Sequence, residues 1–245
     1  MQTPENGVKG RIHSFLSMGA VDGPGLRYVV FLQGCPLRCG FSHNPDTWDF
    51  SGGQEREAAE LVQEICRYKM YFGDKGGVTV SGGEPLLQPA FVGELFRLLH
   101  GEGIHTALDT SGVWADWDGA CQVLEHTDLI LGDLKFATPE EYRLHCKADM
   151  EKPLAFYRLA EERGIPLWVR HVVVPGLNDS LEDMGKIKVL AESFSNLEKI
   201  EWLPFHNLCV EKYQSLGIPF PLAGTDNMDE AALERLVEQL NAEGA

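Results

Sequence analysis

Six apolar, β-branched segments that alternate with helix-like segments constrain most strongly what this chain can fold into. The strand-like segments span residues 28–34, 77–83, 105–110, 128–134, 166–174 and 198–205. Between them apolar residues recur at helical spacing, as in 55–72, around Phe91, Leu95 and Leu98, and in 229–240. This alternation predicts an α/β fold with a parallel sheet and the helices outside. Because only six units are recognisable, the pattern favours a partial TIM-type barrel over a complete eight-fold one.

The length and charge of the chain exclude several classes of protein. Its 245 residues, 44% of them hydrophobic, can bury a substantial core, and no linker or repeat divides them, which predicts a single domain over 1–245. A formal charge of −16 argues against binding to nucleic acid or to an anionic membrane. No apolar run approaches the ~20 residues of a bilayer span, and MQTPENGVKGR lacks the apolar core of a secretion signal. We therefore expect a cytoplasmic protein.

Polar residues recur where the predicted strands end. They are Cys35 after the first strand, Gly82, Gly83 and Glu84 after the second, Asp109 and Thr110 at the third, Asp133 and Lys135 at the fourth, Arg170 within the fifth and His206 after the sixth. Parallel α/β barrels build their active sites at the carboxyl ends of the strands. Taken singly, each residue has a simpler explanation, such as a helix cap or a hydrogen-bonded histidine. Their repetition favours a shared pocket.

The segment GCPLRCGFSHNPDTW (34–48) follows the first of these strands. Cys35 and Cys39 are spaced as in a C-x-x-x-C-x-x-C tripod, but Ser42 stands at the third position. Zinc would need four suitable ligands, and His43 would bring this loop to only three. An iron–sulfur cluster held by three thiolates leaves one iron open for another ligand, and the tripod spacing suggests this arrangement.

The remaining four cysteines give no comparable pattern. Cys66 and Cys121 lie in helix-like segments, where a buried structural thiol is the usual explanation. Cys146 and Cys209 have no partner at metal-ligand spacing. In a reducing cytoplasm we expect no disulfide framework.

Longer motifs give the chain a family resemblance. GRIHSF (10–15), VDGPGLR (21–27), the cysteine loop with HNPDTW, SGGEPLLQ (81–88), LDTSG and VVVPG (172–176) together resemble the pyruvate formate-lyase activating enzymes of the radical S-adenosylmethionine superfamily. The resemblance implies a partial (β/α)₆ barrel, a 4Fe–4S cluster, S-adenosylmethionine and a monovalent cation. It implies an oxidoreductase that cleaves S-adenosylmethionine reductively to methionine and a 5′-deoxyadenosyl radical, which takes a hydrogen atom from a glycine of the lyase.

The resemblance also implies partners and an overall organisation. Reduced flavodoxin or ferredoxin would supply the electron, and pyruvate formate-lyase would be the protein substrate. Activases of other glycyl-radical enzymes often carry an inserted ferredoxin-like domain with additional cysteines. Between Ser42 and Gly82 this chain has only Cys66, which favours the single-domain type, acting as a monomer on pyruvate formate-lyase.

Individual residues receive roles from the same resemblance. Cys35, Cys39 and position 42 would hold the cluster, while Asp109, Thr110, Asp133 and the Leu131 carbonyl would bind the cation. Asp22, Lys135 and Arg170 would act in catalysis, Asp22 by meeting the glycine-bearing loop of the lyase. The residues expected to contact S-adenosylmethionine are Phe41, Ser42, His43, Gly82, Gly83, Glu84, Asp109, Asp133, Leu134, Lys135, Arg170, Val172 and His206. Among them, Gly82 and Gly83 would let the backbone approach the methionine group, and Glu84 would lie near its ammonium.

Ser42 departs from the family's pattern, which has cysteine at this position. A hydroxyl is a far weaker acid than a thiol, whose reference pKa is about 8.5, and it is a harder ligand for iron. Since its shape is nearly that of a thiol, we expect the fold to persist and the cluster to be labile, partial or absent, with little or no radical activity. An exchange confined to one residue of an intact motif favours deliberate inactivation over natural divergence.

Three alternative functions remain open at this stage. The chain could activate another glycyl-radical enzyme, or it could bind S-adenosylmethionine or the lyase without a cluster and without chemistry. A radical enzyme acting on a small molecule is the third alternative, and the VDGPGLR segment argues against it.

Overall fold

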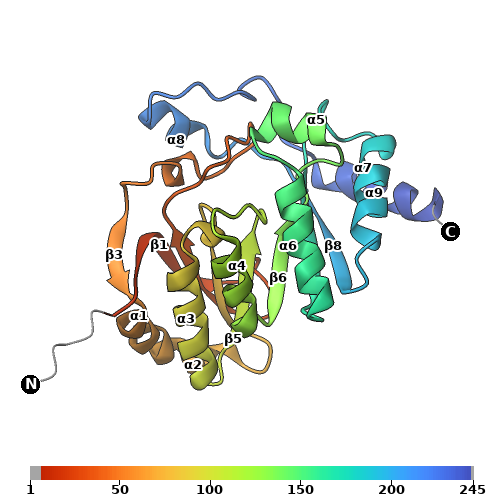
Figure 1. Cartoon of the computed structure of the whole chain (residues 1–245). Coiled ribbons are helices and arrows are strands. Elements are labelled where there is room, and N and C mark those ends of the chain that lie inside the picture. Colours follow the sequence, from red (N-terminus) through yellow and green to blue (C-terminus); the bar gives the residue numbers. More distant parts are fainter. Residues whose placement is uncertain (1–6, 244–245) are drawn as a thin grey trace, which may run out of the picture.

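A computed structural model describes residues 7–243 of the chain, and these residues form one eight-stranded sheet with helices on its outer side (Figure 1). In order across the sheet, the strands are β3 (Gln54–Glu57), β1 (Lys9–Gly19), β2 (Arg27–Leu32), β4 (Gly77–Gly82), β5 (His105–Thr110), β6 (Leu129–Asp133), β7 (Leu167–Val173) and β8 (Leu197–Pro204). From β2 to β8 neighbouring strands are parallel, whereas β1 is antiparallel to both β2 and β3. Because β3 and β8 are the two outer strands, the barrel is partial.

The predicted α/β fold is confirmed, and the six predicted strands form the parallel part of the sheet. Two strands were missed. β3 has the sequence QERE, which contains no apolar residue, and it pairs with β1 in the register Lys9↔Glu57, with an exposed ion pair between Lys9 and Glu55. The prediction of one helix over 55–72 was therefore wrong at its start, because the helix begins at Ala58. β1 mixes polar and apolar residues because much of it stays partly exposed.

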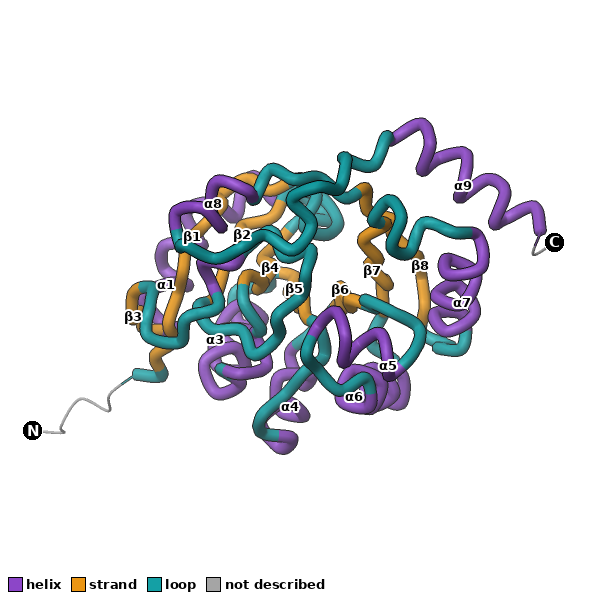
Figure 2. Tube along the Cα trace, turned by 90° about the horizontal axis from the view of Figure 1, so that it is seen from above, coloured by secondary structure: helices purple, strands orange, loops and turns teal. Residues whose placement is uncertain are grey.

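The helices cover the outside of the sheet (Figures 1 and 2). The longer ones are α1 (Ala58–Ile65), α3 (Pro89–Gly101), α4 (Trp117–Val123), α6 (Glu151–Glu162), α7 (Leu181–Glu192) and α9 (Glu230–Glu243), and the short ones are α2 (Lys69–Phe72), α5 (Pro139–Glu141) and α8 (Val210–Ser215). In α3, Phe91, Leu95 and Leu99 recur at helical spacing and are buried in the main core. None of the helices within residues 7–243 has the length and apolar character that crossing a bilayer requires.

Parallel pairing places the carboxyl ends of β2 and β4 to β8 on one rim, which is the upper rim in Figure 1. Two irregular segments lie across this rim. One is the cysteine loop (34–48), which follows β2, and the other runs from the end of β8 through α8 to the start of α9. α8 packs against the short helical turn Pro45–Thr47 of the cysteine loop. The rim is thus covered by one segment from the N-terminal part of the chain and one from its C-terminal part.

Candidate active site

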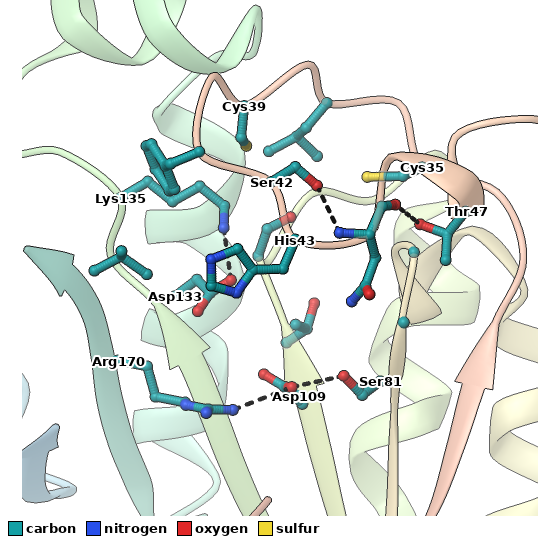
Figure 3. A pocket seen from close by; sticks show the side chains of 18 of the residues that line it. Cys35, Cys39, Ser42, His43, Thr47, Ser81, Asp109, Asp133, Lys135 and Arg170 are labelled. Carbon is teal, nitrogen blue, oxygen red and sulfur yellow. Dashed lines mark hydrogen bonds and ion pairs between the residues drawn. The ribbon is translucent and has the colours of Figure 1, made fainter. Parts of the chain in front are cut away.

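A cavity of about 190 Å³ lies at this rim, between the ends of β4 to β7 and the cysteine loop (Figure 3). It brings together most of the residues predicted from the sequence. Those that line it are Cys35, Cys39, Phe41, Ser42, His43, Gly82, Gly83, Asp109, Thr110, Asp133, Lys135, Arg170 and Val172. The strand ends and the loop that follows β2 therefore do share one pocket.

Charged side chains at the strand ends are held by one another. The Asp109 carboxylate accepts hydrogen bonds from Ser81 Oγ at 2.7 Å and from Arg170 Nη1 at 3.2 Å, and Asp133 accepts one from Lys135 Nζ at 2.6 Å. Burial raises the pKa of Asp109 although the Arg170 charge opposes the rise. The Asp109 charge in turn raises the pKa of Arg170. Ser81, Asp109, Asp133, Lys135 and Arg170 together are called the strand-end wall. Because the wall carries both signs of charge, it suits a ligand that has an ammonium and a carboxylate.

Glu84 is buried and does not line the first cavity. Its carboxylate oxygens accept hydrogen bonds from Thr110 Oγ1 and Ser111 Oγ, both at 2.5 Å, and from the backbone N–H groups of Ser111 at 2.9 Å and Leu86 at 3.0 Å. Burial raises the pKa of Glu84 to about 7. The carboxylate therefore joins the ends of β4 and β5, and the predicted contact of Glu84 with the ammonium of S-adenosylmethionine stays a prediction.

Gly82 and Gly83 let the cysteine loop approach the end of β4. Gly82 has a φ of 101°, in the region that favours glycine. A Cβ atom on Gly83 would lie 2.1 Å from the carbonyl oxygen of Gly34, the first residue of the loop. The same oxygen accepts a hydrogen bond from Glu84 N at 2.9 Å. The glycine pair is thus needed for loop packing, and the predicted approach to a methionine group stays a prediction.

The cysteine loop itself is held by segments distant in sequence. Arg38 N donates to the Cys146 carbonyl at 2.8 Å, and Gly40 N donates to the His145 carbonyl at 3.1 Å. From the other side, Tyr213 OH donates to the Ser42 carbonyl at 3.3 Å. Figure 3 shows Cys35, Cys39 and Ser42 on this loop, facing the charged residues of the strand-end wall.

The donor set of the loop fits an iron–sulfur cluster at two of three positions. Cys35 and Cys39 bring thiols to the cavity, whereas Ser42 brings a hydroxyl that accepts a 3.3 Å hydrogen bond from Asn44 N. Burial raises the pKa of Cys35 to about 12, and a hydrogen bond with the Cys146 thiol lowers that of Cys39. Within residues 7–243 no three side chains of His, Cys, Asp or Glu are arranged to hold a single metal ion. All three positions of the predicted tripod line the cavity, and the third donor is chemically weaker than a thiol.

A second cavity of about 660 Å³ adjoins the first, between the segment 20–24 and the strands β7 and β8. His43 lines both cavities, and its ring stacks on that of His206 with the centroids 4.3 Å apart. Val21 and Gly23, the neighbours of Asp22, line the second cavity. Burial raises the pKa of Asp22, although the charge of Arg170 opposes the rise. The predicted residues Asp22 and His206 thus lie beside the second cavity.

Two leucines predicted for the site do not line the first cavity. Leu134 packs in the main core, and its carbonyl accepts a 2.6 Å hydrogen bond from His171 Nδ1. Leu131 is fully buried in a smaller apolar cluster. The hydroxyl of Thr110 donates to Glu84, so the side chains available to a cation in the predicted site are those of Asp109 and Asp133.

Several residues of the site were missed by the sequence analysis. Ser81, Asn44 and Ser111 line the first cavity. Ser81 belongs to the SGGE motif, so its position at a strand end could have identified it. Tyr213 and Lys212, which contact the cysteine loop, lie far along the chain and carry no local signal.

Comparison with known proteins agrees with this geometry. The Radical SAM superfamily matches residues 29–186, which include the cysteine loop and the strand-end wall. The chain therefore belongs to the radical SAM superfamily. Within it, the pyruvate formate-lyase-activating enzyme of Clostridium pasteurianum is 43% identical over 235 residues, covering 95% of this chain and 98% of that protein. The enzyme of the same name from Staphylococcus epidermidis is also 43% identical, over 97% of both chains. The chain is thus a member of the pyruvate formate-lyase-activating enzyme family.

Solved structures support the fold. A domain of a pyruvate-formate lyase-activating enzyme from Bacteroides vulgatus has a TM-score of 0.54 at 24% identity, covering 69% of this chain and 95% of that one. SuiB from Streptococcus suis, solved with S-adenosylmethionine, has a TM-score of 0.62 at 13% identity, covering 89% of this chain and 43% of that one. At these identities the likeness concerns the fold alone.

Proposed function

We propose that this chain has the architecture of an activase that introduces a glycyl radical into pyruvate formate-lyase, and that Ser42 impairs it. The observation that carries the proposal is the first cavity, in which two thiols of the cysteine loop face the strand-end wall. The family membership supports the same conclusion. We further propose that the chain acts as a monomeric, cytoplasmic, single-domain protein.

The residues of the first cavity suit the binding of S-adenosylmethionine. Lys135 and Arg170 offer positive charge to the carboxylate of its methionine part, and Asp109 and Asp133 offer negative charge to its ammonium and sulfonium. When bound, a 4Fe–4S cluster supplies the electron for reductive cleavage of this molecule. The chain's own contribution is to hold the cosubstrate in a fixed orientation in a site that excludes water.

The second cavity suits a glycine-bearing segment of the lyase. It opens next to Asp22 and communicates with the first cavity through shared residues, among them His43 and Arg170. Val21 on its rim has 76% of its surface exposed, and Leu208, just beyond His206, has 79%. Exposed apolar side chains of this size are typical of protein–protein contact surfaces. The backbone of a lyase segment that entered the second cavity would reach the first cavity, where S-adenosylmethionine is proposed to bind.

A monovalent cation and an acidic electron donor complete the proposal. The carboxylates of Asp109 and Asp133 offer the hard oxygen donors that such a cation prefers, although Arg170 and Lys135 already compensate part of their charge. Arg38 and Lys147 are exposed beside the cysteine loop, on a chain whose formal charge is −16. This local positive charge favours docking of flavodoxin or ferredoxin as the donor.

The Ser42→Cys variant tests the proposal. After anaerobic reconstitution we expect it to hold four irons, to cleave S-adenosylmethionine, and to give a glycyl radical signal by EPR on added lyase. The chain with Ser42 should give a glycyl radical signal more than roughly 100-fold lower than that of Ser42→Cys. Changing a residue that only supports a metal ligand can already cost up to about 100-fold in activity, and Ser42 replaces a ligand itself. Ser42→Ala, which adds no thiol, is the matched control.

Three results would contradict parts of the proposal. Equal iron content and cleavage in the chain with Ser42 and in the Ser42→Cys variant would remove the impairment. Cleavage by Ser42→Cys without a radical on the lyase would remove pyruvate formate-lyase as the client. Normal lyase binding by both forms, with no iron in either, would favour a cluster-free binding protein.

A further inference from the structure

Cys146 lies against Cys39, although no cysteine spacing in the sequence predicts a partner for it. Cys146 and Cys39, one of the two thiols of the tripod, are both buried in the same apolar cluster. The backbones are joined on both sides of Cys39, because Arg38 N donates to the Cys146 carbonyl at 2.8 Å and Gly40 N donates to the His145 carbonyl at 3.1 Å. These bonds hold the cysteine loop against the end of the helical turn Tyr142–Cys146, and a disulfide requires proximity of this kind.

Cys39 and Cys146 are both buried near the cysteine loop, where Cys35 and Cys209 also pack. Cys146 is 0% exposed and Cys39 is 7% exposed, and both pack in the apolar cluster under the cysteine loop together with Leu37, Phe41 and Tyr142. Cys146 does not line the first cavity, whereas Cys39 does. A small oxidant entering the cavity can reach Cys35 or Cys39, and the segment that carries Cys146 is bonded to the backbone on both sides of Cys39.

We propose that Cys39 and Cys146 form a reversible disulfide when the cluster-free chain meets a peroxide. The Cys39 sulfur attacks hydrogen peroxide, the O–O bond breaks, and one water leaves with a sulfenic acid on Cys39. The Cys146 sulfur then displaces the sulfenic hydroxyl as a second water, forming the S–S bond. The two thiols lose two electrons and two protons in all, and the peroxide is reduced to two waters.

The disulfide would act as a redox switch on cluster loading, a consequence that rests on the proposed function. It withdraws Cys39, one of the two tripod thiols that face the cavity, so iron cannot be bound there until a reductant restores it. It also protects Cys39 from further oxidation to the sulfinic acid, which is irreversible in most proteins. Cys146 thereby serves as a resolving cysteine for a metal ligand.

Peptide mapping of the full-length, cluster-free chain tests the disulfide directly. After treatment with equimolar hydrogen peroxide and alkylation without reductant, mass spectrometry should show a peptide that links Cys39 to Cys146, and a phosphine reductant should remove it. Cys146→Ser should instead accumulate sulfinic acid on Cys39. Cys146→Val should do the same, and its apolar side chain keeps the buried position filled. Cys121→Ser, a change on α4 away from the loop, should still give the link. A link from Cys39 to Cys35 or Cys209, or none, would overturn the proposal.

Iron uptake in the Ser42→Cys background tests the consequence. Peroxide should lower uptake roughly tenfold, and phosphine should restore it when Cys146 is present but not in Cys146→Ser. If untreated Cys146→Ser already binds less iron, Cys146 is a ligand and the switch is wrong. Because the mapping needs neither cluster nor lyase, failure of the proposed function would leave the link intact, and failure of the link would leave glycine activation intact.

Discussion

The strand-end wall and the cysteine loop form two sides of one cavity, yet they are positioned in different ways. In the wall, Asp133 and Arg170 are directly paired in the register of β6 and β7, and Asp109 lies one strand further on, opposite Leu131. In the loop, Ser42 is held by a hydroxyl 171 positions away in the sequence, that of Tyr213. The wall is thus built by sheet register, and the loop by docking of remote segments.

This difference has a consequence for stability. The Arg170–Asp109 ion pair joins residues that parallel strand pairing brings to one rim, and the Lys135–Asp133 ion pair joins residues two positions apart in the sequence. The loop contacts with His145, Cys146 and Tyr213 are few, and they can open while the sheet remains folded. The cysteine loop is therefore the more labile side of the cavity.

The largest expected effect is that of Arg170→Met, which challenges the rigidity of the wall. Arg170 lies 3.2 Å from Asp109 and 3.5 Å from Glu201. Its loss removes the cation paired with the poorly exposed Asp109, which keeps the Ser81 hydroxyl, whereas Glu201 keeps its ion pair with Lys199. Breaking such a pair costs about 3–5 kcal/mol of the free energy of unfolding. Urea denaturation of the cluster-free protein measures this loss.

Lys199→Met is the matched control for Arg170→Met. Its ion pair with Glu201 is 2.7 Å long, but the Lys199 side chain is 46% exposed. We expect it to cost at most about 1 kcal/mol. Equal losses in both variants would show that the wall is not held by its buried ion pair.

A second prediction concerns His171, which supports the wall from the outer face of β7. The imidazole shares hydrogen bonds with the Leu134 carbonyl at 2.6 Å and with Asn178 Nδ2 at 3.1 Å. Burial lowers the pKa of His171 from 6.5 to about 4, so the unfolded chain takes up a proton first as the pH falls. This contribution to stability is complete above pH 6.5 and disappears by pH 4, a loss of about 3 kcal/mol.

Comparison of the chain with His171→Gln isolates this contribution. The free energy of unfolding should fall more steeply between pH 6.5 and pH 4 in the chain with His171 than in the variant. Because other groups titrate in the same range, the difference between the two curves is the quantity to measure. If the free energy of unfolding fell equally steeply with pH in both proteins, the lowered pKa of His171 would be refuted.

The smallest expected effect is that of Tyr213→Phe, which probes the loop. Removing the hydroxyl that donates to the Ser42 carbonyl should cost about 1 kcal/mol. Hydrogen exchange should accelerate in 35–48 and stay unchanged in β6 and β7. Tyr28→Phe is the control, because its hydroxyl bonds Glu64 on α1 and its loss should leave the cysteine loop protected. Faster exchange spread evenly over the loop and the strands would abolish the contrast between the two regions.

Much of the fold and of the site could be predicted from local sequence. The six parallel strands are short, apolar and separated by helical patterns, and parallel pairing alone brings residues such as Asp109 and Asp133 to one rim. β3 could not be predicted, because QERE carries no strand signal and pairs with β1, a strand much earlier in the sequence. The inward orientation of Glu84 was missed for a similar reason, since its partners Thr110 and Ser111 lie on another strand and in the turn after it.

The sequence by itself determined the class of the fold, the rim on which the site lies, and the substitution of a hydroxyl for a thiol at Ser42. These follow from periodicity and spacing, which are properties of neighbouring residues. Only the tertiary structure decided that Tyr213 supports the cysteine loop and that Cys146 lies against Cys39. Contacts between residues so far apart depend on how helices and loops pack over the sheet, and that packing is set by the whole chain at once, so no short stretch of sequence records it.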